Sequence, residues 1–208
     1  EHFYLKVMRP GYDDRLPPRQ NLLAGADLTV PLLSRPAPGV LISASIAGRS
    51  LAHRLVEWQR GQAALPGPQE LIHLLDRLPA ATLALPKRPS WSQNIDFHAA
   101  TARQQLPAEA RRIDAAAGAV ADILGQGRHG PVVPTHGDFY EANIFVDGST
   151  LRFIDIDSVG PGLREDDLAC CLAHLAVLPS LDRASYRRVP EVLDAWQHAF
   201  EQQVDAAE

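Results

Sequence analysis

Two short segments, residues 136–143 (His-Gly-Asp-Phe-Tyr-Glu-Ala-Asn) and 154–157 (Ile-Asp-Ile-Asp), constrain the fold of this chain more than any other feature. Between them, the apolar runs 144–146 and 151–154 flank Asp-Gly-Ser-Thr (residues 147–150), which is typical of the turn of a β-hairpin. A hairpin here folds the two polar segments back toward one another at its open end.

The register of this hairpin follows from its turn. If Val146 lies opposite Leu151, then Asn143 lies opposite Ile154, and Asp155 lies one step beyond. A slip of one or two residues still leaves Asn143 and Asp155 at the same end. The pattern therefore predicts an amide and a carboxylate side by side.

Phosphoryl transfer needs such a set of side chains, because positioning and charge neutralisation do most of the catalysis. Asp138 is a candidate base. The candidate Mg²⁺ ligands are Asn143, Asp155 and Asp157, since this ion usually takes only one or two carboxylates besides phosphates and waters. Any one of the four alone is more simply a loop-capping residue or a strand-end acid. The four together, at loop–hairpin spacing, favour a catalytic site.

The sequence His-Gly-Asp-x-x-x-x-Asn, followed by Ile-Asp-x-Asp and then Asp-Leu-Ala (residues 167–169), resembles the aminoglycoside phosphotransferase/choline kinase family. The resemblance implies an α+β, protein-kinase-like fold with two lobes. A truncated N-terminal sheet lobe with the hinge would span residues 1–47, and a larger, mostly helical lobe would span residues 48–208. It also implies transfer of the ATP γ-phosphoryl group, with GTP as an alternative donor and Mg²⁺ as the metal.

The resemblance also assigns roles to residues. Asp138 would be the catalytic base that accepts the proton of the substrate hydroxyl. His136 would orient the catalytic loop, residues 136–143, rather than take part in the chemistry. The metal ligands would be Asn143, Asp155 and Asp157, the first carboxylate being the principal ligand and the second binding directly or through water. Asp167 would cap the helix that it begins and hydrogen-bond the catalytic loop.

Lys6 lies in an otherwise apolar run, residues 3–8, that predicts a strand. The chain has 20 basic residues but only two lysines, Lys6 and Lys87, so a lysine here suggests that a compact point charge is needed rather than a planar guanidinium. By the resemblance, Lys6 pairs with the α- and β-phosphates of the nucleotide. The simpler alternative is a strand lysine that reaches solvent from a sheet edge.

Two features depart from the family pattern. The lysine is normally held by a glutamate on the following helix, but residues 2–56 contain no glutamate. Gln20 occupies the expected place, and Asp13 or Asp14 is a candidate substitute. No Gly-rich phosphate loop precedes Lys6, so we expect a fragment, or a product trimmed of its first two strands.

Residues 39–46 form an apolar strand that runs into a helix start, which resembles the hinge between two kinase lobes. Adenine would then hydrogen-bond backbone groups near Ala44 and Ile46. A buried strand followed by a helix with Ser50 as N-cap explains the pattern equally well without a ligand.

The remainder of the chain is mostly helical by its apolar spacing. The predicted helices span residues 50–65, 69–78, 107–125, 165–178 and 191–207. In the third, an apolar stripe is predicted to lie in the core beneath the catalytic loop; it consists of Ile113, Ala117, Val120 and Leu124. Trp91 lies in a proline-rich loop segment that borders the expected acceptor pocket, although packing is the commoner role of such a residue.

Composition limits the class of protein. The chain is 46% apolar, which argues against disorder, and it has no apolar stretch of ~18 residues, so we expect no membrane association. A net charge of −5 disfavours a nucleic-acid surface. The adjacent Cys170 and Cys171 lack metal-ligand spacing and indicate free thiols in a reducing cytoplasm.

Acidic residues cluster around the predicted site, and they are Glu141, Asp155, Asp157, Glu165, Asp166 and Asp167. Their charge favours a cationic small-molecule acceptor as much as it favours a solvated acidic loop. Three functions stay open. They are a small-molecule O-kinase, a catalytically impaired pseudokinase or nucleotide-binding module, and a metal-dependent phosphohydrolase. The last would use His136, Asp138, Asp155 and Asp157 with water as the nucleophile.

Overall fold

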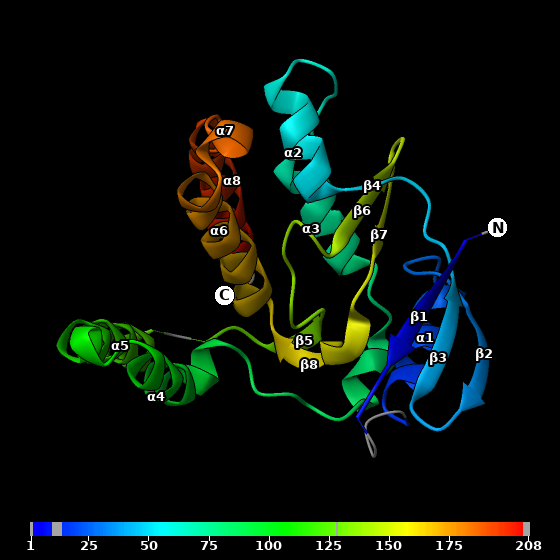
Figure 1. Cartoon of the computed structure of the whole chain (residues 1–208), viewed down its shortest axis with the longest axis horizontal. Coiled ribbons are helices and arrows are strands. Elements are labelled where there is room, and N and C mark those ends of the chain that lie inside the picture. Colours follow the sequence, from blue (N-terminus) through cyan, green and yellow to red (C-terminus); the bar gives the residue numbers. More distant parts are fainter. Residues whose placement is uncertain (1, 10–13, 128, 206–208) are drawn as a thin grey trace.

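The computed structural model describes residues 2–9, 14–127 and 129–205. A small antiparallel sheet lies beside a larger, mainly helical body (Figure 1). The strands are β1 (Phe3–Val7), β2 (Leu32–Ala37), β3 (Val40–Ala44), β4 (Arg49–Ser50), β5 (Val132–Thr135), β6 (Ile144–Asp147), β7 (Thr150–Phe153) and β8 (Gly160–Leu163). The α-helices are α1 (Leu16–Gly25), α2 (Leu51–Gln59), α3 (Pro68–Asp76), α4 (Ile95–Gln105), α5 (Ala110–Gln126), α6 (Arg164–Leu181), α7 (Arg183–Tyr186) and α8 (Pro190–Asp205). The short 3₁₀ turns are η1 (Ala80–Ala84), η2 (Ser92–Asn94), η3 (Pro107–Glu109) and η4 (Ile156–Ser158).

The N-terminal sheet has the strand order β1-β3-β2, with both pairs antiparallel. Lys6 lies on β1, opposite Leu41 of β3, as the strand prediction requires. Helix α1 packs against η4, which contains the second carboxylate of the Ile-Asp-Ile-Asp segment. Helix α1 therefore connects the sheet to the polar end of the hairpin.

The β6–β7 hairpin has the predicted register. Val146 lies opposite Leu151, and the Ile154 N–H donates to the Asn143 carbonyl at 2.9 Å, which continues the ladder by one step. Gly148 in the turn has a φ of +57°, a conformation that glycine adopts without strain. The register prediction is confirmed because local turn chemistry and alternating burial both specify it.

The core of the helical body joins α2, α3, α6 and α8 to the hairpin. Phe139 and Phe153 are fully buried and meet edge to face, with 6.1 Å between their ring centroids. Trp196 and Phe200 of α8 bury their rings in the same cluster. This packing places the catalytic loop and the hairpin on a rigid base. Among the described residues, no helix is long and apolar enough to cross a membrane.

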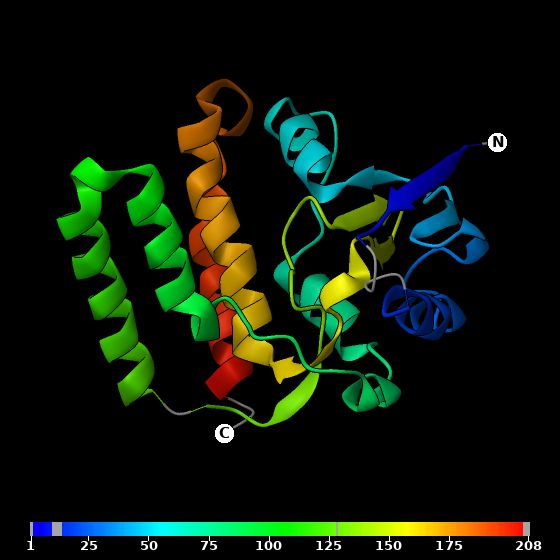
Figure 2. The ribbon, with the colours of Figure 1, turned by 60° about the horizontal axis from the view of Figure 1, so that its bottom comes forward.

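Helices α4 and α5 form a hairpin that projects from the side of the body (Figure 2). The prediction that the α5 stripe lies in the core beneath the catalytic loop is wrong. None of the described side chains of α5 is buried, and Val120 is 41% exposed. The stripe has the expected helical period, but it packs mainly against α4, so only one side of it is covered.

Asp167 lies inside the first turn of α6 rather than at its N-cap, because the helix begins at Arg164 and its N-cap is Leu163. Its buried carboxylate accepts hydrogen bonds from the backbone N–H groups of His136 (2.7 Å) and Gly137 (2.8 Å). Burial raises the pKa of this carboxyl to about 7, against the opposite effect of the two N–H donors. Asp167 therefore fixes the start of the catalytic loop from behind.

We expect Asp167→Asn to lower the free energy of unfolding by about 1–3 kcal/mol, because the amide NH₂ would face one of the two buried N–H donors. Urea unfolding at pH 8, where the carboxyl is mainly ionised, measures this loss. The matched control is Asp194→Asn on the exposed face of α8, with an expected change below about 0.5 kcal/mol. Equal stability of the two variants would show that Asp167 does not hold the loop.

Candidate active site

The catalytic loop joins β5 to β6 and places Asp138 at its surface. Asn143 is buried, and its Nδ2 donates to the Asp138 carbonyl at 3.0 Å and to the Asp138 Oδ2 at 3.3 Å. Burial and the nearby Asp155 charge raise the pKa of Asp138, while hydrogen bonding from Trp91 and Asn143 opposes this. The half-buried carboxylate is thus oriented by Asn143 and made more basic than a solvated one.

Gly137 allows the close approach of two loops. Its φ is +78°, and a Cβ at this position would lie 2.7 Å from the Ser158 carbonyl oxygen. Any larger residue would push the catalytic loop away from the segment that follows Asp155 and Asp157. The glycine of the His-Gly-Asp motif therefore brings the candidate base near the candidate metal ligands.

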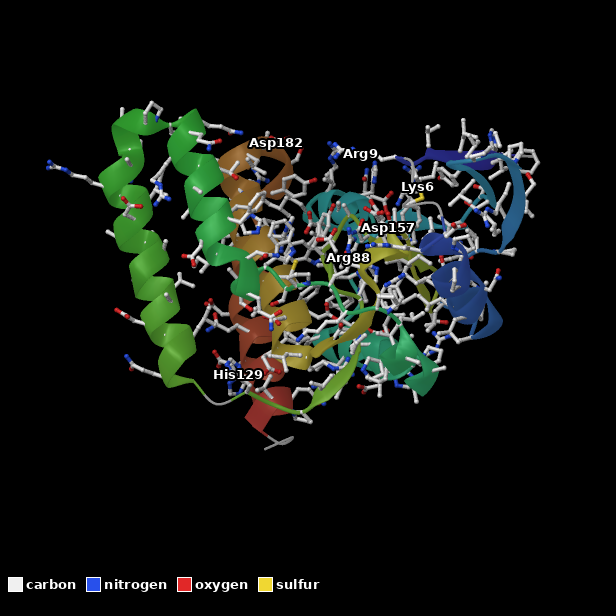
Figure 3. The ribbon with its side chains drawn as sticks, turned by 90° about the horizontal axis from the view of Figure 1, so that it is seen from below. Lys6, Arg9, Arg88, His129, Asp157 and Asp182 are labelled. Atoms are coloured by element: carbon white, nitrogen blue, oxygen red, sulfur yellow. The ribbon has the colours of Figure 1, made fainter. Side chains whose placement is uncertain are left out.

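Asp155 and Asp157 lie just beyond the hairpin. Asp155 adopts a left-handed conformation, with a φ of 51°, which is uncommon outside glycine but tolerated by aspartate. The carboxylates of both residues meet Lys6, with Asp155 Oδ1 and Asp157 Oδ1 each 2.7 Å from Lys6 Nζ. Figure 3 shows Lys6 and Asp157 close together at this point. Burial lowers the pKa of Lys6, but the two carboxylates outweigh it and leave the pKa raised.

A divalent cation fits this set of side chains. Two carboxylate oxygens already converge on one positive charge, the Lys6 ammonium, which marks a point where a cation is stable. The Asn143 NH₂ group donates to Asp138, which leaves the amide oxygen as a further candidate ligand for the metal. Within the described parts of the chain, no group of three His, Cys, Asp or Glu side chains could hold a metal. Two carboxylates and an amide suit Mg²⁺, which needs few protein ligands when phosphates supply the rest.

His136 lies behind the loop. Its ring is fully buried, with Nε2 3.1 Å from the Ile154 carbonyl oxygen and its centroid 4.7 Å from that of Phe153. Burial lowers the pKa of His136 to about 4, so the ring is neutral near pH 7. This environment suits a residue that orients the loop and does not suit one that exchanges protons with a substrate.

A cleft of about 320 Å³ lies between the N-terminal sheet and the end of the hairpin. Lys6, Asp155 and Asp157 line it together with the buried Ile46. Ala44 is not in this lining, and its N–H donates to the Pro31 carbonyl at 3.2 Å. Of the two expected adenine contacts, Ile46 is therefore at the cleft, whereas the Ala44 N–H is already engaged.

None of the described candidates for the missing glutamate holds Lys6. Gln20 is buried on α1 and its side-chain amide donates to the Val30 carbonyl. Asp14 forms an ion pair with Arg35 at 2.9 Å. Asp13 lies outside the described residues. Lys6 is instead positioned by the two candidate metal ligands.

A second cavity, of about 290 Å³, is lined by Asp138. Trp91 lines it, as its place in the sequence suggested. Arg88, Asn94 and His98 also line it, and no sequence pattern marked these three residues as part of a site. Their segment has no clear periodicity, and its proline content indicated only a loop. The density of basic and aromatic side chains in this segment is the one sequence feature that could have indicated a binding site.

The acidic cluster is not available to a ligand as a group. Glu141 is buried beside His174, and Asp167 is buried against the catalytic loop. Glu165 accepts from the Gly130 N–H at 2.9 Å, and Asp166 accepts from the Ser92 hydroxyl at 2.6 Å. The other two acids, Asp155 and Asp157, pair with Lys6. Most carboxylates of the cluster are therefore engaged in contacts within the protein.

Comparisons with known proteins support a kinase-like fold. A choline/ethanolamine kinase family protein from Mesorhizobium loti has a TM-score of 0.58 and 19% identity, over 90% of this chain and 62% of that one. A glucosamine kinase in complex with glucosamine, ADP and inorganic phosphate has a TM-score of 0.51 and 20% identity, over 91% and 58% of the chains. An aminoglycoside phosphotransferase from Streptomyces rimosus has a TM-score of 0.53 and 18% identity, over 93% and 78%.

These likenesses confirm the predicted α+β, protein-kinase-like fold. The chain spans 56% to 60% of the length of the glucosamine kinase structures that it matches. A search of curated proteins finds no match. The model of the phosphotransferase enzyme family matches residues 2–207, which is nearly the whole sequence. The chain therefore belongs to the phosphotransferase enzyme family.

Proposed function

We propose that this protein transfers the γ-phosphoryl group of ATP to a hydroxyl group of a small molecule, with Mg²⁺ as the metal. The observation that best supports this is the convergence of Asp155 and Asp157 on Lys6 next to the loop that holds Asp138. It supports the proposal because a cation, two carboxylates and a candidate base are the groups that phosphoryl transfer requires near one another. GTP is the alternative donor.

In this proposal the chain positions reactants and moves one proton. The nucleotide occupies the cleft lined by Ile46, and Lys6 turns from the carboxylates to the α- and β-phosphates. Asp138 accepts the proton of the acceptor hydroxyl as that oxygen bonds to the γ-phosphorus and the bond to the β-phosphate oxygen breaks. Its raised pKa, a result of burial, favours this proton transfer.

The metal would be held by Asn143, Asp155 and Asp157. When bound, Mg²⁺ neutralises the charge of the phosphates. With the two carboxylates engaged by the metal, Lys6 would be free to pair with the phosphates of the nucleotide. Asn143 has a second function, because its NH₂ group orients Asp138.

We expect Asp138→Asn to lower turnover by about 10²–10⁴, the usual effect of losing a positioned base, with nucleotide affinity nearly unchanged. Transfer of label from ATP to a panel of hydroxyl acceptors measures turnover, and calorimetry with MgADP measures affinity. Asp147→Asn in the exposed hairpin turn is the matched control and should retain full activity. Unchanged turnover in Asp138→Asn would remove this residue from its role.

We expect Asp155→Asn to abolish the Mg²⁺-dependent part of nucleotide binding, because one of two converging carboxylates is lost. ADP titrations in the presence and absence of Mg²⁺ separate that part from metal-independent binding. The same control, Asp147→Asn, should bind as the parent protein does. If Mg²⁺ strengthens ADP binding equally in Asp155→Asn and in the parent, the metal lies elsewhere.

A nucleotide-binding module without turnover is the second candidate function. It is favoured by the position of Gln20, whose side chain bonds Val30 and leaves Lys6 without a helix carboxylate. Such a module would bind MgADP and transfer no phosphate to any acceptor. The phosphohydrolase alternative has less support, because the buried His136 ring is not placed to bind a metal with Asp155 and Asp157.

A further inference from the structure

The cavity beside Asp138 has an aromatic wall. Trp91 lines it and is 54% exposed, although an indole of this size is usually covered. Its ring stacks on His98, with 4.8 Å between centroids and 26° between planes. The stack holds the indole in the cavity that Asp138, the candidate base, also lines. A flat, held ring next to a base is suited to pack against the apolar face of a cyclic acceptor.

The same cavity contains a guanidinium. Arg88 lines it and is exposed, and its Nη1 donates to the Ser158 hydroxyl at 2.9 Å. That contact fixes the position of the side chain but uses only one of its five N–H donors. Among the described residues, Arg88 has no carboxylate within ion-pair distance. Its remaining donors form a planar fork that matches a carboxylate.

Negative charge is scarce in this cavity. Asp138 is the one carboxylate among its described lining residues, and the base is needed for the acceptor hydroxyl. The acidic side chains that could attract a cation are engaged with Lys6, with backbone N–H groups or with Ser92. A cationic acceptor would therefore meet Arg88 with no carboxylate other than the candidate base to compensate it.

We propose that the cavity lined by Arg88, Trp91 and Asp138 selects a cyclic hydroxyl acceptor that carries a carboxylate. The carboxylate pairs with Arg88, the ring packs on Trp91, and a hydroxyl faces Asp138. This inference rests on the proposed function and names the substrate class of the same site. It differs from an amine-bearing acceptor, which the acidic cluster had suggested.

The first test compares three acceptors that differ mainly in charge: glucuronate, glucose and glucosamine. We expect kcat/KM to be highest for glucuronate, and Arg88→Gln to lower it about tenfold while glucose changes little. Arg111→Gln on the exposed surface of α5 is the matched control. A preference for glucosamine overturns the proposal. So does an equal loss for all three acceptors with a raised nucleotide KM, which would place Arg88 on the phosphates.

The second test needs no turnover and reads the charge beside Trp91 directly. The chain has three tryptophans; Trp196 is buried, and Trp58→Phe removes the other. Each quenching constant is divided by that of free N-acetyltryptophanamide with the same ion, because iodide quenches any indole more efficiently than caesium does. We expect the normalised constant of Trp91 to be larger for iodide than for caesium, and Arg88→Gln to remove this difference. Equal normalised constants in the Arg88 protein overturn the proposal, even if no acceptor is phosphorylated. Failure of MgADP binding would instead contradict the proposed function, so the two results are distinguishable.

Discussion

Two carboxylates that lie two residues apart share one positive charge, and the rest of the site depends on this arrangement. Asp155 and Asp157 both bond Lys6, which lies 149 and 151 positions earlier in the chain. Like charges at this spacing repel unless a cation compensates them. The Lys6 ammonium supplies that charge and at the same time ties the N-terminal sheet to the end of the hairpin. An exposed ion pair contributes little to stability, so the main effect of these contacts is to position Lys6 beside the two carboxylates.

The catalytic loop is held from the opposite side by buried groups. Asp167 bonds its backbone, His136 fills the space between the loop and β7, and Gly137 permits contact with Ser158. The loop therefore has little freedom where Asp138 begins. Rigid support behind a half-buried carboxylate is what a positioned base requires, since a misplacement of about 1 Å can cost about a hundredfold in rate.

Sequence reasoning succeeded where the determinants were local. The hairpin register followed from its turn and its alternating burial, and it brought Asn143 next to Ile154 as expected. The prediction for α5 was wrong, because an amphipathic stripe shows that one face of a helix packs but does not identify the element that it packs against. The stripe of Val120 and its neighbours meets α4 rather than the core. Lys6 is held by Asp155 and Asp157 in place of the missing helix glutamate. These contacts join distant segments, and spacing along the chain does not reveal them.

The acceptor side was the least predictable part for the same reason. Arg88 lies fifty residues before Asp138 in a segment without periodicity, and only the fold brings the two to one cavity. The acidic residues near the motif suggested a cationic ligand, yet most of them are engaged in contacts within the protein. Net charge near a motif is thus a poor guide to the charge that a ligand meets, because buried and paired groups contribute little of it.

In the proposed function, Asn143, Asp155 and Asp157 together bind a divalent ion with the nucleotide. Paramagnetic broadening by Mn²⁺ in the presence of ADP tests it most directly, read in the amide resonances of labelled protein. We expect strong broadening of the Asn143 side-chain NH₂ and of the backbone amides of residues 155–157, with sharp signals from α5. Sharp signals from all of these groups, with broadening elsewhere, would contradict it.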